Sequence, residues 1–356
     1  MSFLSRTPVV FAISDRYEIA VNFKYDGICS LTVGDKEYFS EIAGIKLSEQ
    51  TFHKISVPMA ELDSAKKYTV NFRRTVIKRS YFPVFEKTVS LTFEFKPILN
   101  KDKINAYHLA DVHYNFEKGV NCAKFFGDSL DLLIVNGDIG EVEEEKNFTE
   151  LYDFLADITG GKIPVIFTRG NHDTRGVLAY RFPQYFPTEN GNHYYTTSLG
   201  DLFFIILDCG EDKNDDHPEY NNVNLFKQYR EKQIDFIKNI KVPTGKTPIC
   251  ITHMCPGRTS KHKNDIFNID LDVYAEWVKG LNALKVKLMI AGHTHKAEII
   301  KPNGAVIPHD YPILIGSQLN ALGKLYGTAI TFENKKAICS FTDDDCKIKY
   351  SETIDL

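Results

Sequence analysis

The stretch "LMIAGHTHKA" (residues 288–297) passes from an apolar run through a glycine to two histidines, His293 and His295. A short, continuous apolar run of this kind is typical of a buried strand. Four further apolar runs also end in residues that can bind a metal ion. "INAYHLA" (104–110) leads to Asp111 and His113, "DLLIVNG" (131–137) to Asp138, "PVIFTRG" (164–170) to Asn171, His172 and Asp173, and "TPICIT" (247–252) to His253. Five strands are therefore expected to deliver polar side chains to one edge of a sheet.

The residue types at these strand ends indicate a metal site. Asp, Asn and neutral His suit Mn²⁺, Fe or Zn²⁺, and ligands of α/β sheets bind beyond the carboxyl ends of the strands. In D-x-H and H-x-H pairs, residues i and i+2 of an extended chain share a face, so one pair can bind one ion or two adjacent ions. Each fragment alone could be a core histidine or a capped turn. The set of five favours metal binding.

The N-terminal residues have a different pattern. Residues 1–97 contain short alternating runs such as "YEIAVNFK", "CSLTVG" and "KYTVNFRRTV", separated by turn residues, which predicts an antiparallel β-sandwich domain. Leu62 lies six residues before Tyr68, which resembles the tyrosine corner of fibronectin type III and immunoglobulin-like domains. The polar stretch 96–105 is the expected linker. Residues 98–356 alternate strands with helical stretches, which predicts an α/β domain whose closing strands lie in 332–356.

Composition narrows the class of protein. The chain of 356 residues suits two domains, and its seven cysteines form no C-x-x-C pair, which argues against a disulfide framework and a structural zinc site. The start of the chain lacks a secretory pattern, and no apolar run approaches the ~20 residues of a membrane helix. We therefore expect a cytoplasmic protein without a membrane partner. The net charge of −4 argues against a nucleic-acid polymer as a partner, because binding the phosphate backbone requires basic residues.

The order D-x-H, G-D, G-N-H-D, H and G-H-x-H resembles the calcineurin-like metallophosphoesterase superfamily across residues 104–330. The resemblance implies a four-layer α/β/β/α sandwich that holds two metal ions. It assigns the first ion to Asp111, His113, Asp138 and His295. It assigns the second ion to Asp138, Asn171, His253 and His293, with Asp138 as the bridge between them.

The resemblance also implies a reaction, in which a hydroxide that bridges the metals attacks the phosphorus of a phosphate ester in line. His172 is then no ligand; it stabilises the transition state or protonates the leaving group. Glu141 and Asp173 are the two alternatives for the residue that supports His172. Glu141 stands where purple acid phosphatases, which also carry a fibronectin-like domain, have a metal-binding Tyr, so their charge-transfer chemistry is not expected. Arg169 and Arg175 flank the G-N-H-D turn and could contact a substrate phosphate or form ion pairs with acidic loops.

We therefore predict a metal-dependent phosphomonoesterase or phosphodiesterase that acts on a small or nucleotide-like substrate. One alternative is a scaffold that keeps this fold without catalysis and docks a partner; such proteins usually lack a ligand, and none is missing here. A nuclease would require a basic, aromatic groove, which the acidic region 98–356 does not predict. The N-terminal domain is expected to mediate protein or inter-subunit contacts.

Overall fold

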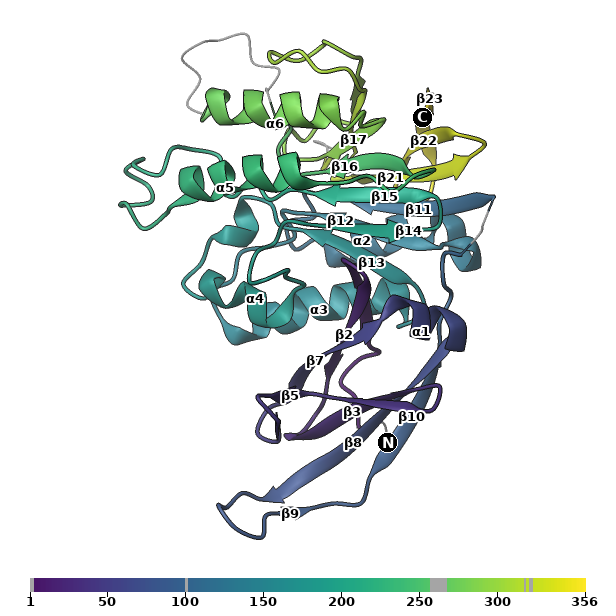
Figure 1. The fold of residues 1–356 in the computed structure, drawn as a ribbon, viewed down its shortest axis with the longest axis vertical. Coiled ribbons are helices and arrows are strands. Elements are labelled where there is room, and N and C mark those ends of the chain that lie inside the picture. The colour runs from purple at the N-terminus through teal and green to yellow at the C-terminus, as the bar shows by residue number, and fades with distance from the viewer. Residues whose placement is uncertain (1–2, 100–101, 257–267, 317, 320–322) are drawn as a thin grey trace.

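The computed structural model describes residues 3–99, 102–256, 268–316, 318–319 and 323–356. Two of the residues in the predicted linker, 100 and 101, lie outside this description. The chain forms two stacked β-sheets between two layers of helices, and a second β-sheet region extends from one side of this body (Figure 1). The predicted four-layer α/β/β/α arrangement with an N-terminal β region is confirmed.

The first of the stacked sheets has the strand order β23-β22-β21-β11-β12-β13-β1-β2-β7, with β20 paired to β21. Its strands from the main body are β11 (Lys103–Leu109), β12 (Leu132–Asn136), β13 (Pro164–Thr168), β20 (Gln318–Leu319), β21 (Leu325–Glu333), β22 (Lys336–Asp343) and β23 (Ile348–Asp355). The central strands β11, β12 and β13 are parallel. Nearly all of their residues are buried, because both faces of the sheet are covered.

The second sheet has the order β14-β15-β16-β17-β19-β18. Its strands are β14 (Tyr195–Leu199), β15 (Leu202–Ile206), β16 (Thr247–Ile251), β17 (Leu288–Ala291), β18 (Glu298–Ile300) and β19 (Ile313–Ile315). Ile134 and Ile166 of the first sheet join Ile249 and Ile290 of the second in one buried cluster. The two sheets therefore share a dry interface that fixes the relative position of their strand ends.

Helices cover the outer faces of both sheets (Figure 1). The helices α2 (Phe116–Ala123), α3 (Glu145–Thr159) and α4 (Phe182–Tyr185) pack on the first sheet, and α5 (Phe226–Asn239) and α6 (Leu271–Ala283) pack on the second. Short 3₁₀ turns lie at η1 (Lys124–Ser129), η2 (His172–Thr174) and η3 (Ala179–Arg181). No helix among the described residues is long and apolar enough to span a bilayer.

The N-terminal residues form two facing β layers. The strands β3 (Gly27–Val33), β4 (Lys36–Phe39), β8 (Lys67–Ile77), β9 (Val84–Phe85) and β10 (Val89–Glu94) make one antiparallel layer, and β1 (Val9–Ile13), β2 (Arg16–Asn22) and β7 (Phe52–Pro58) make the other. Also in this region are the short hairpin strands β5 (Glu41–Ile42) and β6 (Ile45–Lys46) and the helix α1 (Met59–Ala65). The alternating apolar residues of both layers pack together, as the sequence pattern predicts.

The boundary predicted at residue 97 is not a boundary between sheets. β1 pairs in parallel with β13, and Phe11 lies opposite Val165, so the layer β1-β2-β7 continues the first sheet of the main body. The Tyr68 hydroxyl donates a hydrogen bond to the carbonyl oxygen of Gly161, in the turn after α3, at 2.9 Å. The tyrosine of the proposed corner therefore connects the two regions. The strand β1 was not among the predicted strands, because its five consecutive apolar residues do not alternate.

Candidate active site

The predicted ligands lie where expected along the chain, but they come from two sheets. Asp111, Asp138 and Asn171 follow β11, β12 and β13 of the first sheet, whereas His253 and His293 follow β16 and β17 of the second. The expectation of a single sheet edge is therefore wrong. The shared interface between the sheets brings the two edges together.

The backbone at these strand ends is left-handed. The φ angle is positive at five of the predicted ligands, which are Asp111 (53°), His113 (42°), Asp138 (53°), His293 (70°) and His295 (55°). Non-glycine residues rarely adopt this conformation, and such strain concentrates at functional sites. The D-x-H and H-x-H pairs therefore converge through tight turns. The prediction that the two residues of each pair lie on one face of an extended strand is wrong.

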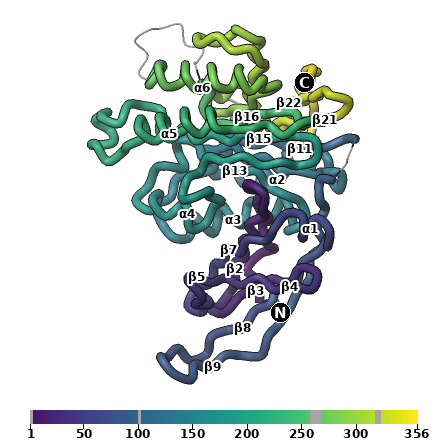
Figure 2. The backbone as a smooth tube through the Cα atoms, viewed as in Figure 1, coloured from purple at the N-terminus to yellow at the C-terminus, as the bar shows by residue number. Residues whose placement is uncertain are grey.

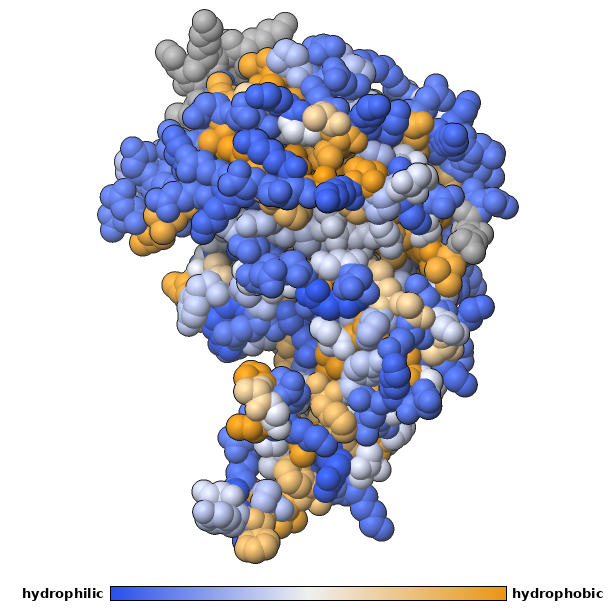
Figure 3. Space-filling model, viewed as in Figure 1, coloured by the Kyte–Doolittle hydropathy of each residue, from blue (hydrophilic) through white to orange (hydrophobic). Residues whose placement is uncertain are grey.

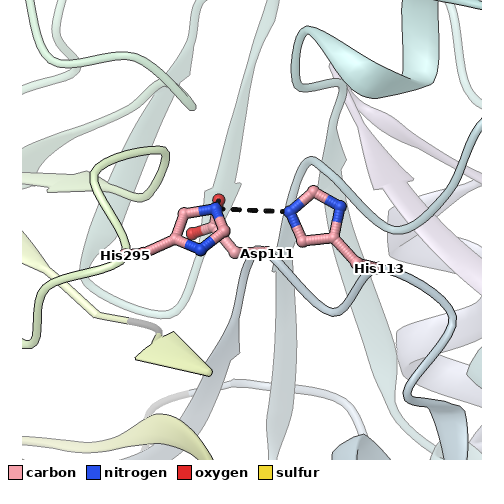
Figure 4. A group of neighbouring side chains, drawn as sticks. All are labelled: Asp111, His113 and His295. Atoms are coloured by element: carbon pink, nitrogen blue, oxygen red, sulfur yellow. Dashed lines mark hydrogen bonds and ion pairs between the residues drawn. The ribbon is translucent and has the colours of Figure 1, made fainter. Parts of the chain in front are cut away.

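The first group of neighbouring ligand atoms belongs to Asp111, His113 and His295, whose atoms all lie within 4.8 Å of one another. The His113 and His295 Nε2 atoms face each other at 3.3 Å, and the His295 Nε2 is 3.4 Å from the Asp111 Oδ1 (Figure 4). Asp111 is fully buried, while His295 is partly exposed. The three side chains therefore form a cradle that opens toward solvent.

The second group contains Asp138, His253 and His293, again within 4.8 Å of one another. The His253 Nε2 is 3.2 Å from the Asp138 Oδ2, and the His293 Nδ1 is 3.0 Å from the Asn171 Oδ1. A third group joins Asp138 to His113 and His172. Asp138 thus lies between the two predicted ligand sets, in the position of a bridge.

The contacts of His253 fit a metal ligand. Its Nδ1 is 2.7 Å from the carbonyl oxygen of Asn136, which can only accept, so Nδ1 carries the proton. In the neutral ring, the Nε2 lone pair then faces two carboxylates, and this buried atom has no hydrogen-bond partner among the described residues. A cation between these atoms would satisfy all of them.

The ionisation of the buried acids also favours a bound cation at this site. Burial raises the pKa of Asp111 to about 7, and the nearby Asp138 carboxylate acts in the same direction. Burial would lower the pKa of His253, but Asp138 and Asp111 outweigh it and raise the value to about 10. Two buried carboxylates at one site attract positive charge, which a bound metal ion or a protonated histidine can supply.

His172 lies beside the candidate ligands and hydrogen-bonds to Glu141. Its Nδ1 is 2.9 Å from the Glu141 Oε1, and its Nε2 is 4.0 Å from the Asp138 Oδ2. Asp173, the other predicted partner, is fully buried and accepts hydrogen bonds from four backbone amides, those of Asp138, Ile139, Gly140 and Gly170. Of the two alternatives, the geometry favours Glu141 as the partner of His172. Asp173 instead ties the loop after β13 to the loop after β12.

The two arginines that flank this turn have different surroundings. Arg169 is held by the buried Asp208, with distances of 2.9 and 2.7 Å from its Nε and Nη2 to the carboxylate. The Arg175 Nε and Nη2 bind the buried carboxylate of Glu211, whereas its Nη1 is 3.2 Å from the His172 Nε2. Arg175 therefore forms an ion pair with an acidic loop, which is one of the two predicted alternatives. It also points its Nη1 group at His172.

Glycines allow the loops to approach closely. A Cβ atom at Gly170 would lie 2.2 Å from the Asp138 Oδ1, and one at Gly137, whose φ is 79°, would lie 2.3 Å from the Gly170 amide nitrogen. No side chain fits at either position without moving the loop that carries Asp138.

Residues 104–297 match the family model described as calcineurin-like phosphoesterase. The chain belongs to this family. Among solved structures, a purple acid phosphatase from yellow lupin (Lupinus luteus) seeds is similar with a TM-score of 0.63 and 14% identity, over 98% of this chain and 74% of that one. A structure described as PhoD is similar with a TM-score of 0.57 and 10% identity, over 98% and 92% of the two chains. No match was found among curated proteins. At these identities the structural likeness concerns the fold.

As a calcineurin-like phosphoesterase, the chain holds a candidate dinuclear His/Asp metal site. The residues that sequence reasoning missed are Glu211 and Asp212, which are buried and lie next to Arg175. The polar stretch 211–224 is typical of a loop insertion, which does not by itself mark a site residue. Nothing in its local pattern links it to Arg175, which is 36 residues away from Glu211.

Proposed function

We propose that this protein hydrolyses phosphate esters of small or nucleotide-like compounds at a dinuclear metal centre. The observation that carries the proposal is the convergence of two ligand groups around Asp138, with His172 and Glu141 beside them. Asp111, His113, Asp138 and His295 would hold one ion, and Asp138, Asn171, His253 and His293 the other. Mn²⁺, Fe and Zn²⁺ all suit these ligands.

Two bound ions would supply Lewis acidity toward a phosphoryl group and a nucleophile from water near neutral pH. Backbone amides hold two of the ligand side chains in place: the Asp111 carboxylate accepts a hydrogen bond from the His293 amide at 3.0 Å, and the Asp138 Oδ1 accepts one from the His172 amide at 2.9 Å. Such preorganisation lowers the cost of ordering the site when metal and substrate bind.

His172 is proposed to act on the substrate. The guanidinium of Arg175 can only donate, so the contact with Arg175 assigns the lone pair of His172 to Nε2 and its proton to Nδ1, which donates to Glu141. Glu141 thereby orients the ring. Once protonated at Nε2, His172 can donate to a phosphoryl oxygen or to the leaving alkoxide.

Arg175 is proposed to bind the phosphoryl group of the substrate. The bidentate contact with Glu211 fixes the guanidinium, and Thr174 and Tyr220 hold Glu211 in turn through hydrogen bonds of 3.1 and 2.8 Å. The Nη1 group faces His172, next to Asp138, so a phosphate at the candidate metals would lie within its reach. A guanidinium held in this way binds phosphate oxygens with defined geometry.

The experiment that tests this function is hydrolysis of p-nitrophenyl phosphate and of bis-p-nitrophenyl phosphate with added Mn²⁺, and with chelator as control. We expect chelator-sensitive hydrolysis of at least one ester. Preference for the diester would identify a phosphodiesterase, and preference for the monoester a phosphatase. Purified protein that binds no transition metal and hydrolyses neither ester would contradict the proposal and favour a scaffold.

A further inference from the structure

The hairpin formed by the end of β8, residues 78–83 and β9 projects from the N-terminal β region, at the end of the molecule opposite α6 (Figure 2). β8 has eleven residues, and β3 pairs with its residues only as far as Arg74. Beyond that point, Thr75 and Ile77 pair with Phe85 and Val84 of the short strand β9. The tip therefore extends past the sheet that anchors it.

Large apolar side chains at this tip are exposed. The exposed fractions are 53% for Val76, 45% for Ile77, 80% for Tyr81, 84% for Phe82 and 37% for Val84. In Figure 3, apolar residues are visible at this end of the molecule among hydrophilic ones. Single exposed apolar residues are ordinary, but a contiguous group marks an interaction surface.

The same hairpin is basic in a chain whose net charge is negative. Residues 73–88 contain Arg73, Arg74, Lys78, Arg79 and Lys87 against one acid, Glu86. Arg74 pairs with Glu86 at 3.3 Å and Lys78 with Asp26 at 2.7 Å. Among the described residues, no acidic side chain pairs with Arg73, Arg79 or Lys87. The hairpin thus retains positive charge next to its apolar tip.

A small cavity lies at the base of the hairpin. Its volume is about 200 Å³, and Lys24, Arg74 and Lys87 line it together with Glu86 and the rings of Phe3, Tyr25 and Phe72. The Arg74 guanidinium lies 4.0 Å from the centre of the Tyr25 ring. The lining holds three cations and one acid, and Glu86 pairs with Arg74, so an excess of positive charge remains that suits an anionic headgroup.

We propose that this hairpin docks the protein on an anionic lipid surface. Aromatic side chains such as Tyr81 and Phe82 favour the boundary between headgroups and acyl chains, and cations behind them are attracted by acidic lipids. The hairpin projects from the body of the molecule (Figure 2), so its tip can enter a bilayer. The expectation of no membrane partner rested on the lack of a spanning segment, which a surface contact of this kind does not require.

Co-flotation with vesicles tests this proposal. The full chain is mixed with phosphatidylcholine vesicles that contain 30% phosphatidylserine or none, at low and high salt. We expect binding only to the acidic vesicles, weakened by salt. The double variants Tyr81→Ser with Phe82→Ser, and Arg79→Glu with Lys87→Glu, should each reduce the bound fraction at least tenfold.

Matched controls are Tyr180→Ser, which alters a similarly exposed tyrosine on the main body, and Lys347→Glu, which alters an exposed lysine near the C-terminus. Both should bind like the unaltered chain. The urea midpoint of every variant should be unchanged, because the altered side chains are exposed. Absence of binding to acidic vesicles, or binding that the tip variants do not reduce, would overturn the proposal. Dimerisation that the tip variants abolish would also overturn it, in favour of a second copy as the occupant.

Discussion

Asp138 is the residue on which both candidate metal sets depend, because it lies within reach of ligands from each. We predict that Asp138→Asn loses metal, since an amide cannot supply the charge that two cations share. His172→Ala should keep both ions and lose rate by ~10²–10⁴, because His172 contacts Glu141 and Arg175 and is not an assigned ligand. Elemental analysis beside steady-state kinetics separates the two effects. Equal metal loss in both variants would refute the assigned roles.

Arg175 offers a second test of the site. We predict that Arg175→Ala lowers kcat/KM on the order of 10²-fold, the cost of losing one fixed donor to a developing charge. Methylguanidinium in solution should restore part of the rate, which a purely structural role would not allow. Arg181→Ala is the control, because Arg181 pairs with Glu145 and does not contact His172. Unchanged kinetics in Arg175→Ala would remove Arg175 from the phosphate site.

The candidate metal ligands could be predicted from sequence, because each lies at or just after the end of an apolar run. The alternation of side chains along a strand could not predict how these residues converge. Asp111 and His113 meet through left-handed turns, and His253 reaches Asp138 across a sheet-to-sheet interface. The choice of Glu141 over Asp173 also required the structure, since only three-dimensional contacts reveal that Asp173 is occupied by backbone amides.

At the scale of elements, the N-terminal strands place one histidine where its protonation opposes folding. His53, on β7, is buried against Phe23, and burial lowers its pKa to about 4. The unfolded chain then takes up the proton first, so stability is complete above about pH 6.5 and falls as pH drops toward about 4.

We therefore predict that the free energy of unfolding decreases between pH 7 and pH 5 by about 2 kcal/mol more in the unaltered chain than in His53→Phe. Urea unfolding at the two pH values measures this difference. The ring of phenylalanine keeps the packing against Phe23 while it removes the titrating group. Equal pH dependence in both chains would show that the pKa of His53 is not lowered by folding.

The elements themselves were largely predictable where periodicity is strong. The alternation of residues 67–76 matches β8. The strand β1 was missed because five apolar residues near a chain start have no period.

At the scale of the whole molecule, the pairing of β1 with β13 makes the N-terminal residues part of the main sheet. We predict that a chain truncated to residues 98–356 is poorly soluble and has a lower urea midpoint, because β13 becomes an edge strand and Phe167 loses its contact with Phe11. A full-length chain whose residues 78–83 are replaced by an Asn-Gly turn is the control and should stay soluble. A truncated chain with unchanged stability would show that the two regions fold independently.

The central claim is that two metal ions, bound by the residues around Asp138, carry out phosphate ester hydrolysis. The most direct measurement is a titration of metal-depleted protein with Mn²⁺ during hydrolysis of p-nitrophenyl phosphate and bis-p-nitrophenyl phosphate. We predict that activity rises to a plateau at two ions per chain and that Asp138→Asn shows no such rise. Activity that persists in chelator, or a plateau that Asp138→Asn shares, would contradict it.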